Sequence, residues 1–278
     1  MSGEPELRVL EDADAAARAA AETIADALGA AVRRRGRADW ATTGGSTPGR
    51  VYGHLASDPL RHAVEWERVH VWWGDDRFVP RDNPLSNVLP LDQILLSMTE
   101  RAGLSGSGGD AALVEIEFDP GVFIPAANVH APRMADAIGR SETVDWVADR
   151  YEEELRAGGV EVGENGFPAF DVLFLGVGPD GHVLSAFPGS PLFDSERWVA
   201  GVPAPTHVEP HVARISLNPK VVAAARLVLP VAFGEGKAAI LADVFGPERD
   251  ERRWPAQLAR REGATWILDR AAAARLQR

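Results

Sequence analysis

The feature that most constrains the fold of this chain is the alternation of short apolar stretches with amphipathic ones. Residues 69–73 and 169–178 are nearly unbroken apolar runs, which is typical of strands buried on both faces of a sheet. Residues 12–35 are rich in alanine, with acid in the first turn, arginines in the last and Gly36 as a stop, which predicts a helix. Strands that alternate with helices predict an α/β fold whose mostly parallel sheet is covered by helices on both faces.

The same patterns predict the remaining elements. Thr47 and Pro48 are suited to the N-cap and first position of a helix that follows a Gly-rich turn. A charged loop is expected after residue 73, and the Gly- and Pro-rich residues 101–127 predict a loop insertion in a single domain spanning residues 1–278. The other predicted elements are a strand at 39–43, helices at 86–98 and at 141–157 with Ser141 as cap, strand, helix, strand and helix at 213–245, and helix, strand and helix at 255–276.

The composition restricts the classes of partner. The chain has 278 residues, of which 45% are hydrophobic and 25% charged, as in ordinary folded proteins. Its net charge of −12 argues against nucleic acid or an anionic membrane surface as the main partner. It has no cysteine, no apolar run approaching about 18 residues and no signal-like N-terminus, so we expect a cytoplasmic protein without disulfide or thiolate chemistry.

Three glycines within residues 176–181 form a literal G-x-G-x-x-G. In a dinucleotide-binding fold this turn leads into a long helix, but here the Pro-containing residues 187–191 break any helix soon afterwards, so we expect no dinucleotide site. The turn instead carries Asp180 and His182 after a buried strand, at the edge where parallel sheets place their sites. The structural alternative is a histidine that is merely hydrogen-bonded within a turn.

A second Gly-rich turn has the parts of an anion site. Gly44 and Gly45 let the backbone approach a ligand, Ser46 and Thr47 supply hydroxyls, and a predicted helix begins there. The turn lacks the lysine of a nucleotide P-loop, which favours a phosphomonoester over a triphosphate. An ordinary capped turn is the alternative.

Further charged and polar residues follow other predicted strands. Asp75, Arg77 and Asn87 lie in a polar stretch in which acids could accept sugar hydroxyls or orient an imidazole, and arginine could meet a phosphate or an oxyanion. A solvated loop is the alternative. Arg214 and Lys237 are also candidates, because a lysine at a helix start opposes the helix dipole and anion binding would explain it.

Two histidines show the spacing of a helical metal site. His207 and His211 are four residues apart, but Pro205 and Pro210 break the helix that would bring their side chains together. We therefore expect no metal there.

In this order along the chain, the motifs resemble those of the 6-phosphogluconolactonase family, sugar-lactone hydrolases of the pentose phosphate pathway. The resemblance implies a modified Rossmann-like fold shared with glucosamine-6-phosphate deaminase and ribose-5-phosphate isomerase. Asp76 stands where the family usually has glutamate, and residues 104–127 are longer than is common. The motifs are TGGSTP at 43–48, WGDDRFVP at 73–80, SN at 86–87, LGVGPDGHVLSAFPGSP at 175–191, RISL at 214–217 and GEGKAAIL at 234–241.

The resemblance implies hydrolysis of 6-phospho-D-glucono-1,5-lactone to 6-phospho-D-gluconate, with His182 as the base that activates water. Asp180 or Asp75 would orient the imidazole or bind sugar hydroxyls, and Arg77 would stabilise the oxyanion together with backbone N–H groups. This scheme requires no metal or organic cofactor. The implied substrate-binding residues are Gly44, Gly45, Ser46, Thr47, Arg77, Asn87, Arg214 and Lys237.

Two other functions remain open on the sequence. A phosphosugar isomerase or deaminase of the same fold would need a second acid or base beside the neighbouring carbon. A non-catalytic sugar-phosphate sensor would be expected to carry a DNA-binding segment, and no helix-turn-helix pattern precedes residue 12. The sequence leaves the oligomeric state open.

Overall fold

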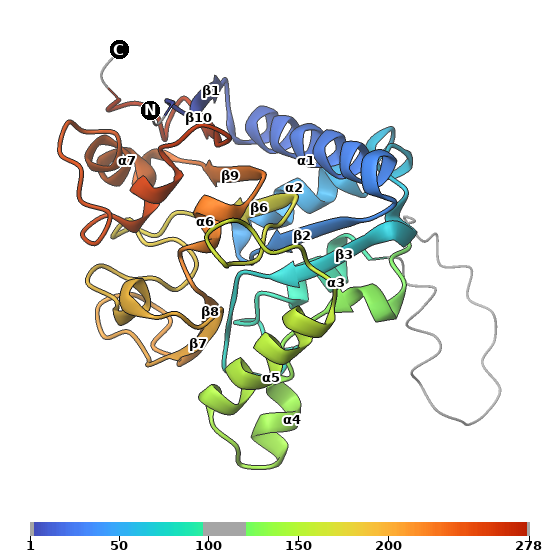
Figure 1. Ribbon diagram of the computed structural model, residues 1–278. Helices are drawn as coiled ribbons and strands as arrows, with labels where there is room; N and C mark the ends of the chain where they lie inside the picture. Colours follow the sequence, from blue (N-terminus) through green and yellow to red (C-terminus); the bar gives the residue numbers. More distant parts are fainter. Residues whose placement is uncertain (1–2, 97–120, 277–278) are drawn as a thin grey trace, which may run out of the picture.

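A computed structural model describes residues 3–96 and 121–276 and contains a seven-stranded sheet (Figure 1). Every neighbouring pair of strands in this sheet is parallel. The prediction of a mostly parallel sheet is therefore confirmed. In spatial order the strands are β1 (Glu6–Leu10), β10 (Thr265–Asp269), β9 (Leu227–Ala232), β6 (Val172–Leu175), β2 (Ala38–Thr42), β3 (Val69–Trp73) and β5 (Val129–His130).

Helices cover both faces of this sheet. Strand β6 is buried on both faces: Val172 and Phe174 belong to one buried core, and Leu173 and Leu175 belong to the other. Figure 1 shows α1 and α2 on one side of the sheet and α4 and α5 on the other. The core beneath α1 also includes α3, and the opposite core includes α6 and α7. The helices are α1 (Ala13–Arg35), α2 (Ser46–Leu55), α3 (Leu89–Ile94), α4 (Met134–Gly139), α5 (Val144–Ala157), α6 (Val221–Ala224) and α7 (Ala238–Val244).

Helix α1 begins and ends as its sequence predicts. The side chain of Asp12 accepts a hydrogen bond from the backbone N–H of Ala15 at 2.8 Å. Gly36 adopts a left-handed conformation with φ of 73°, and its N–H donates to the carbonyl of Val32 at 2.7 Å. A side-chain cap and a C-terminal glycine satisfy backbone groups that a helix leaves unpaired.

A second, antiparallel sheet corrects two predictions. It consists of β4 (Asp75–Arg77), β8 (Arg214–Leu217) and β7 (Val199–Val202), in that spatial order. Residues 75–77 were expected in a loop, and residues 214–217 within the alternating strands of the main sheet. The chain leaves the main sheet at Gly74, whose carbonyl accepts from the N–H of Leu217 at 2.8 Å, and this bond starts the antiparallel pairing.

Several predicted helix boundaries are wrong. Helix α2 begins two residues earlier than expected, with Gly45 rather than Thr47 as N-cap. Thr143 caps α5 by accepting from the N–H of Trp146, whereas Ser141 adopts a positive φ of 56° outside the helix. The predicted terminal helix is a series of turns, and the helix expected before β10 is a short 3₁₀ helix, Pro255–Ala259. Most of the predicted insertion at 101–127 lies outside the described residues.

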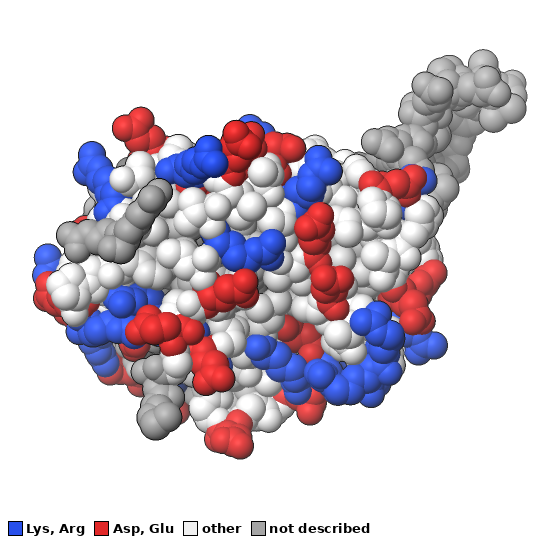
Figure 2. Space-filling model, turned by 90° about the horizontal axis from the view of Figure 1, so that it is seen from above, with Lys and Arg blue, Asp and Glu red and all other residues white. Residues whose placement is uncertain are grey.

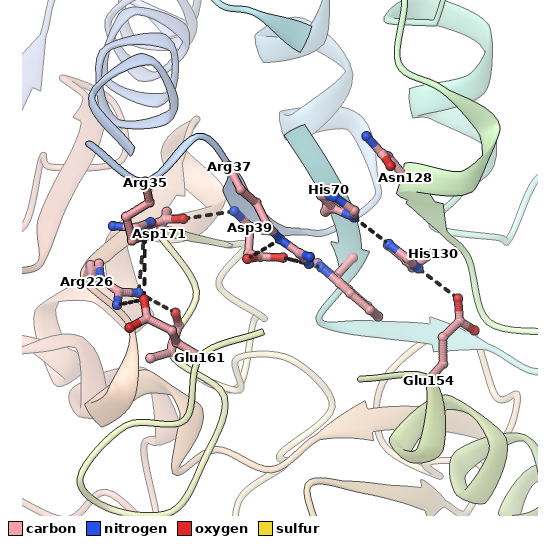
Figure 3. A network of polar contacts seen from close by, with 12 residues as sticks. Arg35, Arg37, Asp39, His70, Asn128, His130, Glu154, Glu161, Asp171 and Arg226 are labelled. Carbon is pink, nitrogen blue, oxygen red and sulfur yellow. Dashed lines mark hydrogen bonds and ion pairs between the residues drawn. The ribbon is translucent and has the colours of Figure 1, made fainter. Parts of the chain in front are cut away.

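Polar side chains crosslink the amino ends of the strands (Figure 3). His130 on β5 bonds through Nε2 to Nδ1 of His70 at 3.0 Å and through Nδ1 to Glu154 at 2.8 Å. Its ring stacks on Trp72 with centroids 3.7 Å apart. These contacts connect β5, the edge strand, to β3 and α5. They lie at the opposite end of the sheet from the carboxyl ends of the strands.

The outer surface is mixed in charge where Figure 2 displays it. Lys and Arg side chains are interspersed with Asp and Glu on the face seen from above. Within the described ranges, none of the helices combines the length and apolar character needed to cross a membrane.

Candidate active site

A cavity of about 300 Å³ opens at the carboxyl ends of β2, β6 and β9. After β2 the chain builds β3 and β5 on one side, and then places β6 on the other side of β2. Such a reversal of strand order leaves a crevice in which α/β sheets bind ligands. The predicted residues that line the cavity are Gly44, Gly45, Thr47, Asp75, Arg77, Asn87, His182, Arg214 and Lys237.

The cavity contains a histidine paired with an acid. Nδ1 of His182 lies 2.5 Å from Oδ1 of Asp180, which does not itself line the cavity. Burial alone would raise the pKa of the Asp180 carboxyl, but hydrogen bonds from His182 and His207 lower it well below its usual value. The ionised carboxylate can only accept, so Nδ1 of His182 carries a proton, and in the neutral imidazole Nε2 keeps its lone pair. Nε2 makes no hydrogen bond to any described residue.

The glycines of the G-x-G-x-x-G form the turn that makes room for the His182–Asp180 pair. The N–H of Gly178 donates to the carbonyl of His182 at 2.8 Å, and Gly181 has a φ of 83° that L-residues rarely adopt. A Cβ atom on Gly178 would lie 2.1 Å from Nδ1 of His182. The motif therefore allows an imidazole to lie against the backbone.

Asp75 is buried and bonded away from His182. Its Oδ2 accepts from the hydroxyl of Ser185 at 2.6 Å, and its Oδ1 accepts from the amide of Asn87 at 3.1 Å. Of the two acids suggested for orienting the imidazole, Asp180 is thus the one in contact with it. The sequence did not single out Ser185, because a serine in an apolar stretch carries no signal of this contact.

The turn after β2 lies against Asn87. A Cβ on Gly44 would be 2.3 Å from Oδ1 and 2.4 Å from Cα of Asn87, so only glycine fits. Gly45 precedes α2 with a φ of 102°, and no side chain caps this helix. Ser46 is the first residue of α2 and Thr47 the second, so the uncapped N–H groups of the helix lie beside the cavity.

Three cations line the cavity with few protein partners. Arg77 on β4 is the direct cross-strand neighbour of Arg214 on β8, and the Nε atoms of both are buried without a hydrogen-bond partner in the described part of the chain. Lys237 donates to the carbonyl of Val177 at 2.6 Å. Burial lowers the pKa of the Arg214 guanidinium and of the Lys237 ammonium. Burial disfavours the charged form of these side chains, and a bound anion would stabilise that form. These cations are therefore suited to binding an anion.

Asp76 does not line the cavity. It is 1% exposed, and its Oδ1 accepts from the N–H of Asn87 at 2.7 Å and of Arg77 at 2.8 Å. Burial raises the pKa of this carboxyl to about 7, against the lowering effect of these two N–H groups. Its contacts hold together the two backbone segments that carry Arg77 and Asn87.

Comparisons with known proteins agree with this geometry. Residues 11–267 match the family model described as glucosamine-6-phosphate isomerases/6-phosphogluconolactonase. A 6-phosphogluconolactonase of Streptomyces coelicolor is 36% identical over 280 residues, covering 100% of this chain and 97% of the relative.

Solved structures agree in fold. The structure of a 6-phosphogluconolactonase from Trypanosoma cruzi is 26% identical with a TM-score of 0.79, covering 100% of this chain and 99% of that one. A monomeric glucosamine-6-phosphate deaminase is 15% identical with a TM-score of 0.72, covering 97% of this chain and 99% of that one, and it shares the fold. The predicted relationship is confirmed: the chain belongs to the glucosamine-6-phosphate isomerase/6-phosphogluconolactonase family.

Proposed function

We propose that this protein is a 6-phosphogluconolactonase, which hydrolyses 6-phospho-D-glucono-1,5-lactone to 6-phospho-D-gluconate in the pentose phosphate pathway. The observation that carries the proposal is a cavity with a carboxylate-oriented imidazole, His182, and partly unpaired cations. The 36% identity to a named lactonase over the full chain supports the choice of substrate.

His182 acts as the base in this proposal. Asp180 fixes the tautomer in which Nε2 is unprotonated, and Nε2 takes a proton from water as the water oxygen bonds to the lactone carbonyl carbon. The carbonyl electron pair moves to oxygen. When the tetrahedral intermediate collapses, the bond from carbon to ring oxygen breaks and His182 returns its proton to that oxygen. The product acid then ionises, leaving the gluconate.

Arg77 and backbone N–H groups of the glycine turns stabilise the oxyanion, since charge develops there only in the transition state. Asn87 binds sugar hydroxyls, and Asp75 orients Asn87 by accepting a hydrogen bond from its side-chain amide. The residues proposed to hold the 6-phosphate are Gly44, Gly45, Ser46, Thr47, Arg214 and Lys237. Binding the phosphate at a remote site positions the lactone for attack.

The test is hydrolysis of freshly generated 6-phosphoglucono-1,5-lactone, followed by acid release with the spontaneous rate subtracted. We expect strong acceleration, and no ammonia release from glucosamine 6-phosphate in a parallel assay. Ammonia release would favour a deaminase. Tight binding of 6-phosphogluconate without acceleration of lactone hydrolysis would contradict the proposal and favour a sensor.

A further inference from the structure

The carboxylate of Asp180 binds a second imidazole besides that of His182. Oδ1 accepts from Nδ1 of His182 at 2.5 Å, and Oδ2 lies 3.0 Å from Nε2 of His207. Because an ionised carboxylate only accepts, both imidazoles donate to it. The two oxygens of one acid are thus shared between the candidate base and a histidine from another part of the chain.

The two imidazoles also share an aromatic neighbour. The ring centroid of Phe187 lies 4.6 Å from that of His182 and 5.6 Å from that of His207, which meets it edge-on at 78°. The guanidinium of Arg214 lies 5.2 Å from the centre of the same ring. The His207 ring is therefore held by an aromatic contact as well as by its hydrogen bond.

His207 lies in the segment 203–213, which joins β7 to β8 and borders the cavity through Val208 and Glu209. Elsewhere in this segment, Nδ1 of His211 donates to the carbonyl of Pro205 at 2.7 Å. The bond from His207 to Asp180 links the segment to the turn after β6.

We propose that His207 is a positioning residue for His182, acting through Asp180. Without His207 the carboxylate is held only at Oδ1, by Nδ1 and the backbone N–H of His182, and it can then rotate, since the terminal torsion of aspartate is broad. A donor on Oδ2 keeps Oδ1 facing Nδ1 of His182 and keeps water from Oδ2. The side chain of His207 is 51% exposed, so its contact with Asp180 contributes little to global stability, and the effect of removing it falls on the site.

The experiment compares His207→Ala with His207→Gln, because glutamine retains an N–H donor of similar reach. His211→Gln is the matched control: His211 is in the same segment, its side chain is 50% exposed, and no hydrogen bond joins it to Asp180 in the structure. Two quantities are measured: the tautomer of His182, from the ¹⁵N shifts of its ring, and kcat and KM for the lactone. The kinetic arm rests on the proposed function, whereas the ¹⁵N arm does not.

We expect wild type and His207→Gln to hold His182 in the Nδ1–H tautomer and His207→Ala to give a mixture. In His207→Ala, kcat should fall roughly three- to tenfold with KM nearly unchanged, the effect of losing one ordinary hydrogen bond at a half-exposed position. His207→Gln should recover most of kcat. A wild-type tautomer and kcat in His207→Ala would overturn the proposal, and so would equal losses in His211→Gln. If wild type does not hydrolyse the lactone, the proposed function fails and the ¹⁵N shifts still decide the role of His207.

Discussion

Arg77 and Arg214 lie directly opposite each other on the antiparallel strands β4 and β8, both beside the cavity. Like charges at such positions destabilise a sheet, and neither Nε atom has a partner in the described residues. The unliganded protein therefore keeps two cations together at some cost in stability. A bound phosphate dianion would offset this repulsion.

Replacing Arg214 should separate stability from binding. Arg214→Met removes a charge at a residue that is only 2% exposed and should stabilise the unliganded protein by about 1 kcal/mol. The same change should raise KM roughly ten- to a hundredfold, because a charged hydrogen bond to the substrate is lost. Thermal unfolding without ligand measures the change in stability, and the substrate dependence of lactone hydrolysis measures KM. An unchanged KM would contradict the phosphate site, and Arg253→Met, at an exposed arginine, is the control.

Gly44 should tolerate no side chain. Gly44→Ala places a Cβ 2.4 Å from the Cα of Asn87, so the turn or the backbone at Asn87 must move and lactone hydrolysis should fall more than tenfold. Gly53→Ala in α2 is the matched control, since its Cβ would meet no atom within 4 Å. This control should keep activity and gain about 0.5 kcal/mol of stability. Equal activity in the two variants would show that the close contact is unimportant.

Some local signals predict the structure correctly, whereas the antiparallel long-range pairing could not be predicted. Asp12 and Gly36 define the ends of α1 through contacts within a few residues. The antiparallel sheet could not be predicted, because its strands are three or four residues long and Asp75 pairs with Ser216. The contact of His207 with Asp180 was missed for the same reason: it joins residues 27 apart through a Pro-rich segment. The cavity residues were found from turn and charge patterns together with family motifs, rather than from periodicity.

Asp76 should make the protein less stable as pH rises. Its pKa is raised to about 7 in the folded state, so between pH 4 and 7 the folded state binds more protons than the unfolded state. Its contribution to stability is present at pH 4 and lost as pH approaches 7, by at most about 1.4 kcal/mol per pH unit. Asp76→Asn should remove this loss, as measured by urea unfolding across that range. A pH profile parallel to wild type, or one matched by the exposed Asp82→Asn, would contradict the assignment.

His70 should make the protein less stable as pH falls, over nearly the same pH range. Burial lowers the pKa of its imidazole to about 4, and the neighbouring Arg37 adds to this effect. Between pH 6.5 and 4 the unfolded state therefore binds more protons, and stability is lost as pH falls. In His70→Gln the acid-side loss should be smaller than in wild type by the same unfolding measurement. His62→Gln, at a histidine whose side chain is 73% exposed, should show the same dependence of stability on pH as wild type. If His70→Gln also shows the wild-type dependence, this role of His70 is ruled out.

The most direct test of the account is the rate of lactone hydrolysis by His182→Ala, with the spontaneous rate subtracted. Loss of a general base should lower kcat by about 10²- to 10⁴-fold. The variant should still be stabilised against thermal unfolding by 6-phosphogluconate, because the proposed phosphate site is intact. A folded variant that hydrolyses the lactone at the wild-type rate would contradict the assignment of His182 as the base.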